Sequence, residues 1–254
     1  MSWAAKRRFI ILLIVGAVVV AFLSVVLIAT FKQVPSCSDG VQNQNEEGVD
    51  CGGPCSYLCV EQERPPTVLF TQAINNGAGR VDIVASVENR NVTSAAKNVP
   101  YRVQLYARDH TLIFESSGVI DLPAGARVPV FIPGAFAGKQ TVANAFLTIA
   151  SSSPQWFRMT ADPRIVPAVS NIKQGGAATA PRVEAVLSNT STTALANVPV
   201  VVFVRDEQGT VIAASQTVVS AIPAQGQAVA IFTWNSAFTR PPASLEVSPL
   251  IPLP

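Results

Sequence analysis

The most pronounced feature of the hydrophobic pattern is an uninterrupted apolar run over residues 9–31, which contains no charged residue. At a rise of about 1.5 Å per residue, a helix of this length crosses a bilayer core of about 30 Å with some tilt. A buried helix of a soluble protein rarely stays apolar on every face for so long. The run therefore predicts a transmembrane helix.

The charges that flank this run predict its orientation. Lys6, Arg7 and Arg8 precede it, and only Lys32 follows closely, so the positive-inside rule places residues 1–8 in the cytoplasm and the rest outside. A cleaved signal peptide shares the charged start, but its apolar region spans only about 7 to 15 residues before a small-residue cleavage site. A type IV prepilin would carry a glutamate near the start of the run, and none is present. We predict an uncleaved, single-pass anchor.

Beyond a polar, proline-containing linker at 61–66, apolar residues alternate with other residues. Alternation with a period of two is typical of strands with one buried face. The clearest such runs lie at 81–87, 103–107 and 183–187. These runs predict antiparallel strands joined by short turns. The final stretch, 248–254, is too rich in proline for a central strand and predicts an extended tail.

The region after residue 80 repeats itself with a period of about 100 residues, which is too long for a solenoid unit and indicates a domain duplication. Both copies have an apolar strand, Asn, a small-residue loop, Asn-Val-Pro, a second strand, Arg-Asp, a turn, a third strand and a Pro-Ala-Gly-type turn. The matched residues are Asn89 with Asn189, Asn98-Val99-Pro100 with Asn197-Val198-Pro199, Arg108-Asp109 with Arg205-Asp206, and Leu122-Pro123-Ala124-Gly125 with Ile222-Pro223-Ala224-Gln225-Gly226. We predict an all-β fold of two tandem sandwiches, each with about seven strands, at 67–163 and 164–250.

This succession of elements resembles the FxLYD and CARDB families of bacterial immunoglobulin-like domains. The resemblance covers most of residues 67–250. It implies immunoglobulin-like sandwiches that serve as an extracellular adhesion, spacer or interaction module, with no shared catalytic residues.

Composition narrows the function classes. Charged residues make up 13% of the chain and the net charge is only +2, which argues against a nucleic-acid surface. The single histidine, His110, falls in a hairpin turn without a metal-binding or nucleophilic neighbour, and no serine has the G-x-S-x-G context. We therefore predict a protein that is not an enzyme, and we expect His110 to be an exposed turn residue.

All four cysteines, Cys37, Cys51, Cys55 and Cys59, lie in the predicted juxtamembrane module at 32–60. Clustered cysteines in an extracytoplasmic segment predict two disulfides, with three possible connectivities. We expect Cys37 to close the longer loop and a neighbouring pair among the other three to bond. A zinc site would need two C-x(2-4)-C knuckles, and the first cysteine stands alone. The C-x-x-C spacing of thiol oxidoreductases is also absent.

Oxygen-bearing side chains crowd the same segment and make calcium a possible ligand. These candidates are Asp39, Asn43, Asn45, Glu46 and Asp50. The match to an EF-hand loop is poor, and a solvated acidic turn is the alternative. The pattern C-x-D-G-x-x-N-x-x-E-x-G-x-D-C-G-G-x-C resembles a small cysteine-rich motif of extracellular and membrane-anchored proteins. That resemblance implies an exposed location and disulfides, without a defined activity, and no cofactor other than calcium is expected.

Two further groups of residues are candidate sites. Aromatic residues that would form a carbohydrate or partner-protein surface if exposed together, and core packing otherwise, are Trp156, Phe157, Trp234 and Phe238. The N-glycosylation pattern occurs at Asn91-Val92-Thr93 and Asn189-Thr190-Ser191. The Ala- and Val-rich composition looks bacterial, so we expect these asparagines to be turn residues.

Together these features predict a membrane-anchored, extracytoplasmic and non-enzymatic protein of the cell surface or envelope. Its partners would be the lipid bilayer and an unidentified surface or envelope protein, and no nucleic acid. The alternative is a structural subunit of a secretion-type or pilus-type complex assembled through the transmembrane helix.

Overall fold

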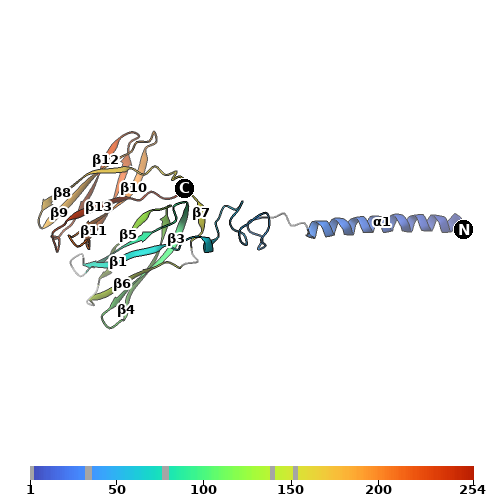
Figure 1. Cartoon of the computed structure of the whole chain (residues 1–254), viewed down its shortest axis with the longest axis horizontal. Helices are drawn as coiled ribbons and strands as arrows, with labels where there is room; N and C mark the ends of the chain where they lie inside the picture. The colour runs from blue at the N-terminus through green and yellow to red at the C-terminus, as the bar shows by residue number, and fades with distance from the viewer. Residues whose placement is uncertain (1–2, 32–35, 76–79, 138–140, 151–153) are drawn as a thin grey trace. The chain divides into compact units, whose positions relative to one another are not determined.

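The protein, seen in a computed structural model, contains one long helix, a small disulfide-bonded segment and four antiparallel sheets (Figure 1). The structure describes residues 3–31, 36–75, 80–137, 141–150 and 154–254. Lys32, which entered the orientation argument, lies outside these ranges. The chain divides into two compact units, Met1–Cys55 and Ser56–Pro254.

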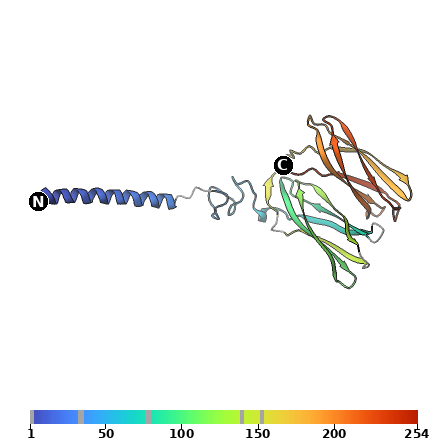
Figure 2. The same cartoon turned by 180° about the vertical axis from the view of Figure 1, so that it is seen from behind.

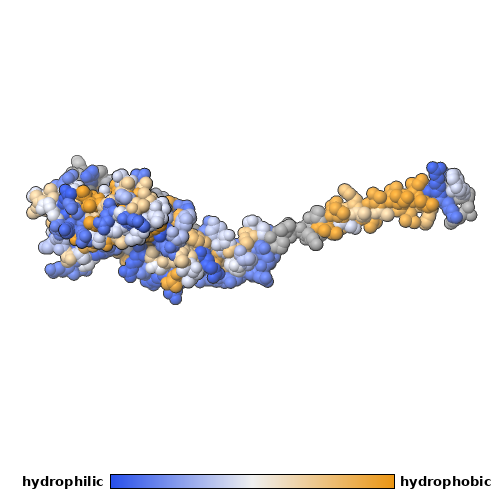
Figure 3. Space-filling view, turned by 90° about the horizontal axis from the view of Figure 1, so that it is seen from above, coloured by the Kyte–Doolittle hydropathy of each residue, from blue (hydrophilic) through white to orange (hydrophobic). Residues whose placement is uncertain are grey.

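The first unit contains helix α1 (Trp3–Phe31). Its stretch Lys6–Ile28 has a mean hydropathy of 3.3, with none of it buried inside the protein. Figure 3 shows apolar side chains along this helix and hydrophilic residues at its N-terminal end. The hydroxyl of Ser24 donates a hydrogen bond to the Val20 carbonyl (2.8 Å), so this polar group is satisfied inside the helix. The helix is long and apolar enough to cross a membrane, and it is consistent with a signal anchor or a signal sequence.

The first half of the second unit is a β-sandwich, here called sandwich 1, preceded by the 3₁₀ turn η1 (Val60–Gln62). One sheet has the order β1-β2-β5, and the other has the order β4-β3-β6, with β7 pairing with the start of β3. The core between the two sheets includes Ile83, Leu105 and Trp156. The strands are β1 (Thr67–Asn75), β2 (Arg80–Glu88), β3 (Ser94–Ala107), β4 (Leu112–Leu122), β5 (Arg127–Ala137), β6 (Val142–Thr148) and β7 (Trp156–Arg158).

The second half, sandwich 2, repeats this arrangement with six strands. Its sheets have the orders β12-β9-β8 and β11-β10-β13, and Leu187, Val202 and Phe232 lie in the core between them. The strands are β8 (Ala168–Ala177), β9 (Ala180–Ser188), β10 (Leu195–Arg205), β11 (Val211–Ile222), β12 (Gln227–Thr233) and β13 (Ser244–Pro249). The predicted all-β class with two sandwiches and one helix is confirmed.

The repeated asparagines explain why both copies keep the same turns. Asn89 is 1% exposed, and its amide donates to the carbonyls of Ser94 (2.9 Å), Leu122 (3.2 Å) and Pro123 (2.9 Å). Asn189 is 2% exposed, and its amide donates to the carbonyl oxygens of three residues at comparable turns. Those residues are Thr193 (2.8 Å), Ile222 (3.5 Å) and Pro223 (3.1 Å). Each asparagine therefore satisfies buried carbonyls where two loops meet.

The hairpin after the second repeated strand corrects one pair of matched residues. The Ala107 N–H bonds to the Thr111 carbonyl (2.9 Å), and the Asp206 N–H bonds to the Thr210 carbonyl (3.0 Å). Asp206 therefore corresponds to Ala107, not to Asp109, as the Arg-Asp match had suggested. Asp109 instead accepts the Thr111 N–H within its own turn (3.1 Å), because aspartate stabilises tight turns at more than one position.

An apolar contact joins the two sandwiches. The outer face of β1-β2-β5 presents Val84 and Phe70 to Val201 and Phe203 of sandwich 2. The Phe70 and Phe203 rings pack edge to face at 6.2 Å, and the Arg205 guanidinium lies 5.1 Å from the centre of the Phe70 ring. Val84, Val201 and Phe203 are all at most 2% exposed. Burial of these apolar side chains stabilises the contact between the sandwiches.

The region 248–254 only partly matches the predicted extended tail. Strand β13 includes Ser248 and Pro249, which pair with Val201 and Val200 of β10. Proline is tolerated here because β13 pairs with β10 alone and so lies at the edge of its sheet. Residues 250–254 follow β13 without regular structure.

Candidate functional site

The cysteine-rich segment forms two disulfides. Cys37 bonds Cys55, with a Cα–Cα distance of 5.6 Å, and Cys51 and Cys59 are the other two bonded cysteines. The prediction that Cys37 closes the longer loop is confirmed, whereas the prediction of a neighbouring pair among the other three is wrong. A turn at Gly52 and Gly53, both with positive φ, separates Cys51 from Cys55. Cys55, which follows this turn, bonds Cys37.

The acidic turn inside this segment is built from carboxylates that accept backbone N–H groups. Asp50 accepts from Asp39 and Gly40, both at 2.9 Å. Glu46, only 6% exposed, accepts from Asn43 (3.3 Å) and Asp50 (3.2 Å). Each carboxylate thus stabilises a loop that has little apolar core of its own.

The pKa of Asp39 is lowered by this network. The largest cause is the hydrogen bond from the Asn43 side chain (2.9 Å), followed by the N–H groups of Ser36 and Val41. These donors stabilise the ionised form of the carboxyl group. Asp39 therefore carries its charge throughout the neutral pH range.

The calcium candidates of this segment serve first as acceptors within the turn. In the described part of the chain, the one group of three metal-ligand side chains within reach of a common point is Cys37, Glu46 and Cys55. The two sulfurs of that group are bonded to each other, so they are not thiolate ligands. Calcium bound by Asp39, Asn43, Asn45, Glu46 and Asp50 stays a prediction.

The aromatic candidates lie in two separate places. Trp156 is 1% exposed in the core of sandwich 1, and Phe157 beside it is half-buried. In sandwich 2, the Trp234 indole donates to the Ala214 carbonyl (3.1 Å) and packs edge to face on Phe238 at 5.1 Å. The structure therefore favours packing roles for these residues over a shared binding surface.

A different aromatic pair has an exposed member, and the sequence analysis missed it. Tyr106 of β3 and Phe146 of β6 pack edge to face at 5.9 Å, and Phe146 is 52% exposed. Beside them, the Gln104 amide donates to Glu115 (2.7 Å). The alternation along β3 places Tyr106 and Gln104 on the same, outward face. That alternation was the signal in the sequence that could have identified this surface.

The remaining candidates occupy turns. His110 is exposed and has a φ of 64° in the hairpin after β3, as predicted for a turn residue. Asn91 is 8% exposed, and its amide donates to the Arg64 carbonyl (2.8 Å). Asn189 is buried as described above. Both asparagines of the glycosylation pattern are thus turn residues whose amides are engaged inside the fold.

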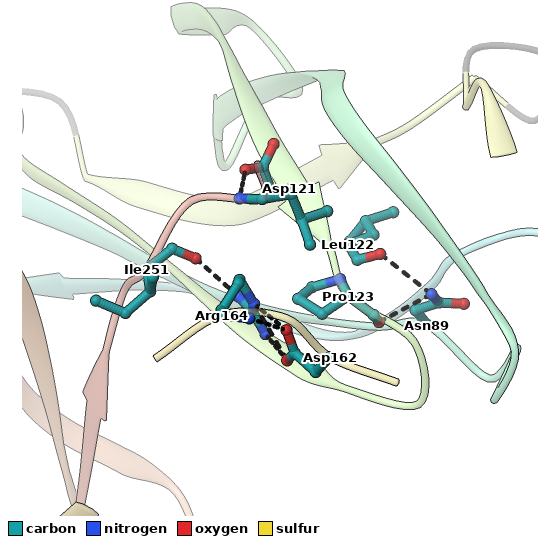
Figure 4. Close-up of polar contacts among 8 residues, drawn as sticks. Asn89, Asp121, Leu122, Pro123, Asp162, Arg164 and Ile251 are labelled. Carbon is teal, nitrogen blue, oxygen red and sulfur yellow. Dashed lines mark hydrogen bonds and ion pairs between the residues drawn. The ribbon is translucent and has the colours of Figure 1, made fainter. Parts of the chain in front are cut away.

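Polar residues from the two sandwiches meet at the junction between them (Figure 4). Arg164, between β7 and β8, donates to the Asp162 carboxylate (2.7 Å) and to the Ile251 carbonyl (2.7 Å). The hydrogen bond from Arg164 lowers the pKa of Asp162. Asp121 of β4 accepts the Leu253 N–H (2.7 Å) and the Asn98 N–H (2.8 Å). The junction borders a groove of about 710 Å³.

No protein-family model matches the chain, and no curated protein matches it either. The resemblance to FxLYD and CARDB domains therefore rests on the repeated turns and strands alone.

Proposed function

We propose that this protein is a non-enzymatic, single-pass membrane protein that presents two immunoglobulin-like sandwiches outside the cytoplasm for protein interaction, adhesion or spacing. The observation that carries the proposal is helix α1, whose residues 9–28 include no charged side chain and are exposed on all sides of the helix. Such a helix needs a lipid environment. The cluster Lys6, Arg7 and Arg8 at its start favours a cytoplasmic N-terminus.

Two other features support an extracytoplasmic position for the domains. The four cysteines are all oxidised, and disulfides persist in compartments outside the cytoplasm. For partner binding, the exposed Phe146 and the half-buried Tyr106 beside it offer sandwich 1 a surface, because aromatic residues are enriched in interfaces. The repeated turns resemble those of bacterial immunoglobulin-like modules, which fits a cell-surface location.

A second candidate is a structural subunit of a secretion-type or pilus-type envelope complex. Gly16 and the neighbouring Ala17 and Ala21 give the helix small residues for close packing against another membrane helix. A Cβ added at Gly16 would meet no atom within 4 Å. The backbone is therefore open to a neighbouring helix at this point.

Reporter fusions test the topology. Alkaline phosphatase fused after Pro254 should be active in the native cell, and a fluorescent protein that folds only in the cytoplasm should stay dark there. Replacing Lys6, Arg7 and Arg8 together by Glu should reduce the phosphatase activity, because it removes the orienting charge. The same change at Lys97, Arg108 and Lys173, three exposed residues of the sandwiches, is the matched control. A cytoplasmic reporter that is bright in the unmodified protein would contradict the proposal.

Crosslinking in the native cell distinguishes the two candidates. A partner captured through the sandwiches should be lost with Phe146→Ala and kept with Val119→Ala, another exposed residue of the same sheet. A membrane partner lost with Gly16→Leu and kept with Phe146→Ala would instead favour the envelope-complex subunit.

A further inference from the structure

Residues 250–254 connect the two sandwiches although they belong to no strand. The Leu250 N–H bonds to the Pro199 carbonyl of sandwich 2 (2.8 Å). Only three residues later, the Leu253 N–H bonds to the Asp121 carboxylate of sandwich 1 (2.7 Å). Both views of the chain place its C-terminal end beside β7 of sandwich 1 (Figures 1 and 2). This short segment therefore spans the junction.

The side chain of Leu253 is held by sandwich 1. It is 2% exposed and packs with Ala95 and Met159, which are also buried, and with Ala124 and Phe157. Deleting a leucine side chain from such a site removes a large share of the local packing energy. Leu253 is thus the anchor of the segment.

The connection between the sandwiches is tied to the same segment. Arg164 lies in the stretch between β7 and β8, and its Nη1 donates to the Ile251 carbonyl (2.7 Å). Asp162 holds the guanidinium in place through Nε and Nη2. The inter-sandwich connection and residues 250–254 therefore hold each other across the junction.

The receiving carboxylate is fixed as well. Asp121 accepts the N–H of Asn98 through its other oxygen (2.8 Å), and Asn98 has a φ of 53° at a register shift of β3. The segment itself is stiffened by Pro252 and Pro254, because proline fixes φ and lowers the entropy lost on binding. The stiff segment 250–254 thus binds a carboxylate, Asp121, whose position is already fixed by Asn98.

We propose that residues 250–254 are a latch, an intramolecular ligand of sandwich 1 that fixes the angle between the two sandwiches. The apolar contact around Val84 and Phe203 holds the sandwiches on one side, and the latch holds them at a second point. Two separate attachments prevent the rocking that a single interface permits. This inference does not depend on the proposed function, because it concerns only contacts within Ser56–Pro254.

Hydrogen–deuterium exchange of the full chain in detergent micelles tests the latch. In Leu253→Ala, the amides of residues 250, 251 and 253, the three in this segment that carry a hydrogen, should exchange about 30-fold faster or more, as expected for loss of a buried leucine. Amides of 159–167 and of 211–217 at the sandwich contact should also exchange faster, by about tenfold. Protection at 83–87 and 183–187 should not change, because the sandwich cores remain folded. Leu112→Ala, at a leucine that is 45% exposed, is the matched control.

Arg164→Ala is the second variant, since it leaves the Leu253 side chain in place. It should accelerate exchange at 250–254 and 211–217, whereas Arg182→Ala, on the outer face of β9, should not. The double variant Arg164→Ala with Leu253→Ala should exchange little faster than Leu253→Ala alone, because both changes release the same latch. Faster exchange confined to 250–254 in both single variants, or none at all, would overturn the proposal. If Leu253→Ala also exposes 83–87, Arg164→Ala alone decides.

Discussion

At the scale of single residues, Asn89 and Asn189 connect the loops at one end of each sandwich. Each is almost fully buried, and each satisfies carbonyls of two different loops. Some salt bridges of the sandwiches are exposed on both sides, as in Arg182–Glu184, and exposed pairs contribute little to stability. The asparagine that follows β2 or β9 is therefore a buried link between two loops of its sandwich.

Replacing either asparagine by alanine should lower the free energy of unfolding of its own sandwich by about 2–4 kcal/mol, because buried carbonyls lose their donor. Amide exchange at 83–87 and at 183–187 measures the loss in sandwich 1 and in sandwich 2 separately. The exposed Asn144 provides the control substitution. Equal loss in both sandwiches from one substitution would contradict a local role.

Asn43→Ala should raise the pKa of Asp39 toward its ordinary value of 3.8, because the Asn43 amide is the largest cause of the depression. Because the pKa of Asp39 is lower in the folded chain than in the unfolded chain, its carboxylate stabilises the fold at pH values above the unfolded-state pKa. This contribution is lost as the pH falls through the folded-state pKa. The acidic turn of Asn43→Ala should therefore open at a higher pH than that of the natural protein. Carboxyl ¹³C titration measures the shift, with Gln42→Ala as the control; an unchanged pKa would refute the assignment.

At the scale of elements, local patterns predicted most of what forms. The apolar run predicted α1, and the period of two predicted strands such as β2 and β9, because both patterns express which face is buried. The pairing among Cys51, Cys55 and Cys59 was predicted wrongly, since the spacing of cysteines does not give the path of the backbone through the turn at Gly52 and Gly53. The sequence could not show whether Trp156 is buried or exposed, because that depends on the pairing of β7 with β3, which is distant in the sequence.

The cysteine-rich segment depends on its bridges. Replacing Cys37 and Cys55 by Ser should destabilise this segment by about 3 kcal/mol, as expected for a bridge that spans 18 residues. Amide exchange at 38–50 should rise to the rate of an unfolded chain, while 83–87 stays protected. Persistent protection at 38–50 in the double variant would show that the carboxylate network alone maintains the turn.

At the scale of the whole molecule, the two sandwiches differ in the residues on the outer faces of their corresponding sheets. Val84 is buried against sandwich 2, whereas the corresponding residue of β9 is Glu184, which pairs with Arg182. The ladders confirm the correspondence, since Val84 lies opposite Phe131 and Glu184 lies opposite Ile231. The corresponding face of the second copy is thus exposed and mixed, with the Glu184–Arg182 pair beside the exposed Val229 and Ile231. The period and the turns predicted the duplication. The difference between Val84 and Glu184 could be explained only from the structure, which shows the contact between the sandwiches.

Val84→Glu should therefore cost about 3–5 kcal/mol, because it buries an uncompensated charge between the sandwiches. The equivalent face of sandwich 2 supplies the control, Ile231→Glu, at a residue that is 42% exposed. Urea unfolding of the full chain should distinguish the two variants clearly. Similar stability of both would argue that the sandwiches are not in contact in solution.

The burial of Asn91 and Asn189 has a consequence for the choice of expression host. Eukaryotic secretory cells attach glycans to Asn-x-Ser/Thr while the chain is still emerging, before burial can protect an asparagine. A glycan on Asn189 would then occupy the amide that must reach the Ile222 and Pro223 carbonyls, and the turn could not close. We expect material made in such cells to be misfolded in proportion to its glycan content, and bacterial material to be free of this defect.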